Sequence, residues 1–189
     1  MNLCVYASSS DALSPVYKEA AESLGRLMGT GGHTLIYGGG KIGLMGVLAR
    51  SVHQHGGHVV GVIPEKLRTR ELTYEEADEL IMTKTMRERK SIMEERADAF
   101  VALPGGLGTA EEVMEILVLR QLAYHEKPLV FLNTNGIYDK LFEFFHALTE
   151  ERFVKPEQRH LFFIAATPED IFRYLEEYNP EPHVDKWFA

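Results

Sequence analysis

Hydrophobic positions along the chain alternate between short continuous runs and longer stretches with helical spacing. The continuous runs predict strands at 3–7, 34–37, 59–63, 80–83, 99–103, 128–132 and 161–165. The stretches between them predict helices at 15–30, 43–55, 86–97, 137–152 and 167–178, and a further helix that ends near 124. Strands separated by helices of this length form a parallel sheet through right-handed crossovers. The pattern therefore predicts an α/β fold, a doubly wound, Rossmann-like parallel sheet with helices on both faces.

The organisation of the chain follows from the same pattern. Runs such as VVGVI at 59–63 and AFVAL at 99–103 are apolar on both faces, as buried parallel strands are. Residues 1–178 are predicted to form a single domain, and 179–189, with two prolines, a surface tail. The polar segment 65–78 is expected to be a loop over a site. In such sheets, ligands bind beyond the carboxyl ends of the strands.

Two helix starts carry a recognisable capping signal. Ser14 and Thr167 each precede a proline, which favours the first position of a helix. Asp170, three residues after Thr167, adds a second capping group. We therefore expect both residues to be N-caps.

Composition narrows the function classes. The 189 residues carry a formal net charge of −8, which argues against general attraction to nucleic acid or to an anionic membrane. A basic pocket for a small phosphorylated ligand stays possible. Cys4 is the only cysteine, so no intrachain disulfide is expected and a reducing compartment is favoured. With no signal peptide or membrane span recognised in the sequence, the expected location is the cytoplasm.

The first glycine-rich turn follows the predicted strand at 34–37. Gly38, Gly40 and Gly43 fit G-x-G-x-x-G, the dinucleotide fingerprint, which is weak evidence when it stands alone. The turn lies in the second strand–helix unit, and the acid at about the expected distance, Glu65, lies beyond the next strand. We therefore favour close packing with some ligand contact over a full nicotinamide dinucleotide site.

The second glycine-rich turn reads PGGLGTAEE at 104–112 and falls at the same edge of the predicted sheet. Its glycines allow a ligand to approach the backbone, and Thr109 could supply a hydroxyl and cap the following helix. No G-K-[ST] follows, so this is not a Walker-type triphosphate loop. The turn suits a monophosphate, although a plain turn with a threonine cap would have the same sequence.

Two carboxylates, Glu111 and Glu112, follow this turn directly. Adjacent residues in a helix diverge by about 100°, so the two cannot form a tight acid pair in one pocket. At most one of them faces the chemistry. Considered alone, both could simply complement the helix dipole.

A charged segment upstream changes this interpretation. MRERK at 86–90 could be a solvated helix face, but Met86, Arg89 and Lys90 match an MxxRK motif, and 104–112 matches PGGxGTxxE without a gap. With YGGGKIGLMG at 37–46, GVIPEKL at 61–67, DAFVALPGG at 98–106 and KPLVFLN at 127–133, the chain resembles the Lonely Guy (LOG) family from about residue 3 to 178. Members of that family are cytokinin riboside 5′-monophosphate phosphoribohydrolases.

The resemblance implies an activity and a set of site residues. It implies hydrolysis of the N-glycosidic bond of an adenosine-type 5′-monophosphate to free base and ribose 5-phosphate, by a homodimer with no cofactor or metal. Arg89 and Glu112 match the family's catalytic residues. The residues expected to contact the substrate, besides Arg89, are Glu71, Lys90, Gly105, Gly106, Leu107, Gly108, Thr109 and Glu111.

The sequence also departs from the family pattern. Many relatives have a Cys-Gly-Ser-Ser run after the first strand, where this chain has Ala7-Ser8-Ser9-Ser10, and Val118 replaces a common threonine. Neither change removes a catalytic group, and both bear on base preference and on fine substrate contacts. Relatives have also been labelled lysine decarboxylases, which only the presence of Lys41 and Lys90 would support here.

The proposed chemistry explains why these residue types are needed. Breaking an N-glycosidic bond builds positive charge on the ribose, and a carboxylate beside the anomeric carbon stabilises that charge. Glu112 can also take a proton from the attacking water. Arg89 stays charged, so an electrostatic role suits it better than proton donation.

Other interpretations stay open at this point. A nucleotide carrier or sensor of the same fold would need no Arg89–Glu112 pair, and an oxidoreductase would use the first glycine turn. His53, His55 and His58 could suggest a metal, but they span a helix end and a strand start, so convergence is not expected. A cluster of phenylalanines is expected in the core or on a dimer surface: Phe142, Phe144 and Phe145.

Overall fold

The computed structural model describes residues 1–69, 72–180 and 182. In this part of the chain, seven strands form one parallel sheet in the order β4-β3-β2-β1-β5-β6-β7. The strands are β1 (Asn2–Tyr6), β2 (Thr34–Tyr37), β3 (His58–Pro64), β4 (Glu79–Thr83), β5 (Ala99–Ala102), β6 (Leu129–Leu132) and β7 (Phe163–Ala165). Each lies within two residues of its predicted bounds, and the parallel α/β fold is confirmed.

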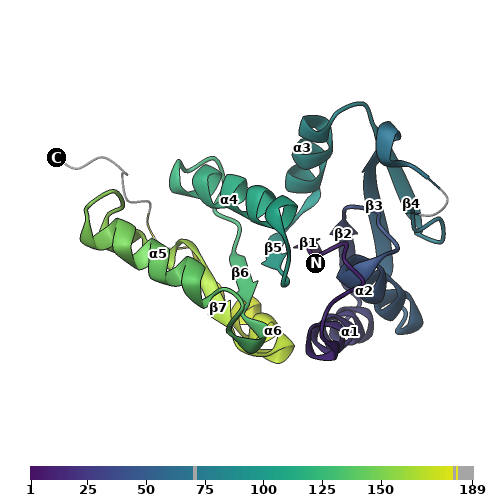
Figure 1. Ribbon diagram of the computed structural model, residues 1–189, viewed down its shortest axis with the longest axis horizontal. Coiled ribbons are helices and arrows are strands. Elements are labelled where there is room, and N and C mark those ends of the chain that lie inside the picture. Colours follow the sequence, from purple (N-terminus) through teal and green to yellow (C-terminus); the bar gives the residue numbers. More distant parts are fainter. Residues whose placement is uncertain (70–71, 181, 183–189) are drawn as a thin grey trace.

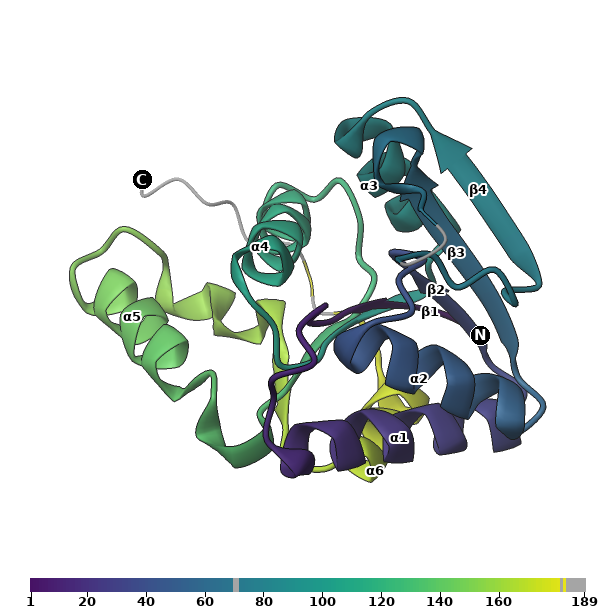
Figure 2. The same cartoon turned by 45° about the vertical axis from the view of Figure 1, so that its right-hand side comes forward.

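Helices cover both faces of this sheet (Figures 1 and 2). Helices α1, α2 and α6 pack on one face, and α3, α4 and α5 on the other. Their bounds are α1 (Pro15–Thr30), α2 (Gly43–Gln54), α3 (Met86–Arg96), α4 (Leu107–Gln121), α5 (Asp139–Glu150) and α6 (Pro168–Glu177). Short 3-10 turns add Glu65–Leu67, Thr134–Gly136 and Pro156–Leu161.

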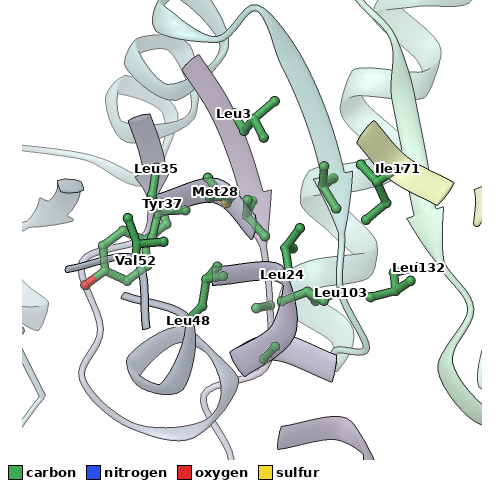
Figure 3. Close-up of a cluster of buried hydrophobic side chains, with 14 of the residues drawn as sticks. Leu3, Leu24, Met28, Leu35, Tyr37, Leu48, Val52, Leu103, Leu132 and Ile171 are labelled. Atoms are coloured by element: carbon green, nitrogen blue, oxygen red, sulfur yellow. The ribbon is translucent and has the colours of Figure 1, made fainter. Parts of the chain in front are cut away.

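The larger core lies beneath α1 and α2 (Figure 3). Leu24 and Met28 of α1 and Leu48 and Val52 of α2 are fully buried against the strands. Their spacing of four residues within each helix places them on one stripe of that helix. Burying such a side chain stabilises the fold by about 1.5–3 kcal/mol. The apolar residues that recur with helical spacing in the sequence therefore form the core-facing side of each helix.

The opposite core is rich in aromatic rings. Phe142 and Phe162 stack with ring centroids 5.6 Å apart, and both meet Phe131 of β6 edge-on. Phe145 also packs against Phe162, whereas Phe144 is 54% exposed. The predicted phenylalanine cluster therefore divides between core and surface.

Helix ends agree with the sequence in part. Thr167 and Asp170 form a full capping box at α6. Ser14 occupies the N-cap of α1, but its side chain makes no capping hydrogen bond. Helix α4 ends at Gln121 rather than near 124, since Ala123 has a φ of 59° that no helix continues through.

The strand order creates a crevice at the centre of the sheet. From β1 the chain moves outward to β4, then returns to β5 on the other side and moves outward again to β7. The loops after β1 and β5 therefore lead away in opposite directions from a topological switch point, the place where α/β sheets bind ligands. They stay in contact through the Ser8 N–H, which donates to the Pro104 carbonyl at 3.2 Å.

Two sequence predictions fall at the limits of the structure. Of the predicted tail, only residues 179, 180 and 182 are described. Glu71, predicted to contact substrate, lies outside the described residues. Among those residues, no helix combines the length and apolar content needed to cross a membrane.

Candidate active site

A cavity of about 530 Å³ opens at the switch point between β1 and β5. One wall is the serine run Ser8–Ser10 after β1, and another is the first turn of α4. Helix α3 contributes Arg89 from the side, and α4 contributes Glu112. The volume is ample for a small-molecule ligand.

Arg89 and Glu112 form a buried ion pair in this cavity. Arg89 Nη1 donates to Glu112 Oε1 at 2.8 Å, and Arg89 Nε donates to the Val62 carbonyl of β3 at 3.0 Å. The two residues are only 9% and 8% exposed. The structure thus brings together, in one contact, the two residues that the motifs singled out.

Burial changes the acidity of Glu112. Loss of solvent raises the pKa of its carboxyl, the nearby Arg89 charge lowers it, and Glu111 raises it again, so that the net pKa lies above the usual glutamate value. A carboxylate with a raised pKa is a better proton acceptor than an exposed one. Glu112 is therefore suited to act as a base at the cavity wall.

The second glycine turn meets the cavity as the N-terminus of α4. Gly106 is the N-cap and Leu107 the first helical residue, so the prediction that Thr109 caps the helix is wrong. The first helical hydrogen bond runs from the Ala110 N–H to the Gly106 carbonyl at 3.0 Å. The N–H groups of the preceding helical residues have no acceptor within the helix, and such groups bind anions well.

Thr109 instead packs inside this turn. It is 5% exposed, and a Cβ on Gly105 would lie 2.1 Å from its Oγ1. Gly105 is therefore required for Thr109 to sit where it does. Leu107, by contrast, is 92% exposed at the rim.

Glu111 points to a different partner from Glu112, as the helical divergence predicts. Lys90 Nζ contacts Glu111 Oε1, and lies 2.8 Å from Glu115 Oε2. Burial lowers the pKa of Lys90, but the two carboxylates raise it by more. The net pKa of Lys90 therefore lies above the usual lysine value, which favours the ammonium form. Lys90, predicted to contact substrate, thus lies between two acids of α4.

The loop after β3 contacts the first glycine turn. The Lys41 N–H donates to the Leu72 carbonyl, and the Tyr74 N–H to the Gly39 carbonyl, each at 2.9 Å. Leu67 in the same loop lines the cavity. Gly43 has a φ of 65° and packs on the Ser9 backbone, which explains the need for glycine in that turn without a dinucleotide.

The three histidines do not converge. His53 and His58 both approach Asp78, whose Oδ2 also accepts the Val59 N–H, whereas His55 bonds the Ser51 carbonyl of its own helix. No cluster of potential metal ligands is found in the described ranges 1–69, 72–180 and 182.

Sequence reasoning missed part of the cavity. The Val62 carbonyl that holds Arg89 is a backbone group and has no signal in the sequence. Ser8–Ser10 line the cavity, although the sequence drew attention to them only as a departure from a family pattern. Met45 and Met93 also line it, and in the sequence they are ordinary helix core positions.

Comparison with known sequences identifies close relatives. The sequence model of a family described as "Possible lysine decarboxylase" matches residues 45–175. A rice protein named probable cytokinin riboside 5′-monophosphate phosphoribohydrolase LOGL2 is 41% identical over 95% of this chain and 73% of its own length. An Arabidopsis thaliana protein named cytokinin riboside 5′-monophosphate phosphoribohydrolase LOG5 is 42% identical over 94% of this chain and 78% of its own.

Solved structures share the fold at lower identity. The molybdenum cofactor carrier protein of Chlamydomonas reinhardtii superposes with a TM-score of 0.70 at 24% identity, covering 93% of this chain and 96% of its own. The molybdenum cofactor binding protein of Rippkaea orientalis gives a TM-score of 0.70 at 22% identity, covering 93% and 94%. At this identity the likeness shows the fold alone.

Proposed function

Because the chain belongs to the Lonely Guy family of cytokinin riboside 5′-monophosphate phosphoribohydrolases, we propose that it hydrolyses the N-glycosidic bond of adenosine-type 5′-monophosphates. The products are the free base and ribose 5-phosphate. The observation that carries the proposal to particular residues is the buried Arg89–Glu112 pair beside the N-terminus of α4.

The two ends of this site suit the two ends of the substrate. The α4 N-terminus, with residues 105–109, would bind the phosphate through backbone N–H groups and the Thr109 hydroxyl. Glu112 lies one helical turn beyond Gly108, so an anchored phosphate would leave the ribose near its carboxylate. Binding energy from the phosphate would then position the reacting carbon.

In the proposed reaction, the glycosidic bond breaks with its electron pair passing to the base. The ribose gains positive charge, which the Glu112 carboxylate stabilises. Water attacks the anomeric carbon and gives its proton to Glu112, while the base nitrogen gains a proton from solvent or from the site. Arg89 holds the carboxylate in place, and its charge lowers the carboxyl pKa against the effect of burial.

The remaining site residues are proposed with different roles. Lys90 and Glu111, which form an ion pair with each other, would contact the substrate at the edge of the phosphate site. Leu107 would close the rim of the cavity. Glu71 is proposed from the sequence motif alone, as a substrate contact from the loop after β3.

Two competing activities have little support in this site. A non-catalytic carrier would not require a buried carboxylate held by arginine, because burying such a pair is costly. A lysine decarboxylase would need a reactive lysine amine. Two carboxylates pair with Lys90 and raise its pKa, so its amine stays protonated and is a poor nucleophile.

The assembly is proposed to be a homodimer of single-domain subunits in the cytoplasm. Helix α4 exposes Val118 and, just after its end, Leu122, while α5 exposes Phe144 and contains no fully buried residue. Both helices cover the same face of the sheet, and exposed apolar groups on one side of a protein are typical of an interface. The single, buried Cys4 suits a reducing compartment.

The activity is tested by incubating the pure protein with AMP and with isopentenyladenosine monophosphate. We expect equal amounts of free base and ribose 5-phosphate from at least one of them. Adenosine and isopentenyladenosine, which lack the phosphate, serve as controls and should react far more slowly. Tight retention of the monophosphates without release of base would instead favour the carrier.

A further inference from the structure

In the first glycine turn, the role of Gly38 is not explained by backbone conformation. Gly38 directly follows β2 beside the cavity and does not have a positive φ. A Cβ built on Gly38 would lie 2.0 Å from Arg89 Nη2 and 3.2 Å from Arg89 Cζ. The missing side chain is therefore the space in which the guanidinium lies.

The guanidinium cannot easily move aside. It is a rigid plane, and its Nε and Nη1 are already fixed by the Val62 carbonyl and the Glu112 carboxylate. Ordinary contact needs about 3.5 Å, so Nη2 would have to retreat by roughly 1.5 Å from a Cβ at position 38. A shift of that size in a rigid plane breaks at least one of its two hydrogen bonds.

We propose that Gly38 is a positioning residue for the hydrolysis: its lack of a side chain seats the Arg89 guanidinium between Val62 and Glu112. The expected effect on catalysis rests on the proposed function, whereas the expected displacement of the Arg89 guanidinium rests on the geometry alone. It gives the first glycine turn of this chain a task different from the dinucleotide binding that G-x-G-x-x-G suggests. The turn makes room for a protein cation rather than for a ligand phosphate.

The neighbouring glycine provides a matched control. A Cβ on Gly40 would lie 2.7 Å from Cε of Met45, a flexible side chain, and Arg89 is not among the atoms nearest to it. Gly38→Ala and Gly40→Ala therefore impose similar steric changes within one turn. Only the first displaces the guanidinium.

The kinetic test is a double-mutant cycle with Gly38→Ala and Arg89→Ala. We expect Gly38→Ala to lower kcat roughly 100-fold, the effect of misplacing a catalytic group by about 1 Å, with KM changed only a few-fold. Gly40→Ala should stay within about threefold of the parent enzyme. In the Arg89→Ala background, Gly38→Ala should have no further effect, because the group it displaces is gone. Losses that multiply would overturn the proposal.

A second readout does not depend on activity. Carbon-13 NMR titration of the Glu112 carboxyl should show a higher pKa in Gly38→Ala than in the parent, because the Arg89 charge has moved away, and no change in Gly40→Ala. An unchanged pKa in Gly38→Ala would overturn the proposal even if the protein hydrolysed no nucleotide. If Gly38→Ala unfolds, the double variant should refold, and failure of both to fold would show that the clash is not with Arg89.

Discussion

Arg89 of α3 donates to Glu112 of α4 over 2.8 Å, and the same guanidinium donates to the Val62 carbonyl of β3. Three elements therefore meet through one side chain at the wall of the cavity. The contact leaves the Glu112 carboxylate with one oxygen held by arginine, and Glu112 itself is only 8% exposed. A carboxylate so placed is oriented by the arginine, whose charge favours the ionised form that stabilises a developing positive charge.

The first prediction separates the two adjacent acids. Glu112→Gln should reduce kcat/KM by about 10²-fold or more, because the amide cannot stabilise the ribose cation or take a proton. Glu111→Gln is the matched control and should retain activity within about fivefold, since that side chain contacts Lys90 instead. Release of base, measured by chromatography, distinguishes them. Equal losses in the two variants would place the chemistry elsewhere.

The second prediction concerns pH. Burial raises the Glu112 pKa, so the acid limb of kcat/KM should lie above the ordinary glutamate value of about 4.3, with activity present above that limb and lost below it. Arg89→Lys should move the limb to higher pH, because an ammonium cannot match the two-sided hold of the guanidinium. Rates measured from pH 4 to 9 test both. A limb that stays in place in Arg89→Lys would contradict the electrostatic role.

The third prediction decides what Lys90 does. If Lys90 neutralises Glu111 beside the phosphate site, Lys90→Met should raise KM by about two- to fivefold through repulsion of the phosphate. Adding Glu111→Gln should then restore most of the loss, because Glu111 is the one of the two freed carboxylates that lines the cavity. Steady-state kinetics on the single and double variants provide the comparison. A double variant as poor as Lys90→Met would mean that the lysine itself binds the substrate.

The fourth prediction concerns assembly. Light scattering should give the mass of a dimer for the parent chain, and Leu122→Glu should shift it toward the monomer by placing a charge among the exposed apolar groups near α4 and α5. Val16→Glu changes a side chain of similar exposure on α1, which packs on the other face of the sheet, and should remain dimeric. Circular dichroism verifies that both variants fold. Two variants that dissociate equally would place the interface elsewhere.

The fifth prediction concerns the loop that crosses the first glycine turn. Burial tends to raise the pKa of Asp78. The hydrogen bonds from the Val59 N–H and from His53, together with the His53 charge, lower the pKa by more than burial raises it, so the net pKa lies below the usual value. The ionised form therefore stabilises the fold above the unfolded pKa of about 3.9, and this contribution is lost as pH falls. Asp78→Asn should lower Tm by a few degrees at pH 7, and less at pH 3. An equal shift at both pH values would exclude the charge as the cause.

The sequence by itself determined the fold class and the two motifs. Continuous apolar runs and helical spacing are local properties, and they placed every strand of the sheet and the faces of α1 and α2. Resemblance to a family added the roles of Arg89 and Glu112. Predicted helix boundaries differ from the structure where local geometry intervenes. Helix α4 ends before Ala123, and α5 begins only after a 3-10 turn.

The tertiary structure alone decided which groups meet. The strand order put the loops after β1 and β5 at one crevice, and no local pattern encodes that order. Thr109 looked like a helix cap until the backbone showed that Gly106 holds that position. The two acidic partners of Lys90 and the proximity of Gly38 to Arg89 are likewise contacts between distant segments. Sequence patterns report the conformation of neighbours along the chain, whereas the site consists of contacts between distant segments that only packing brings together.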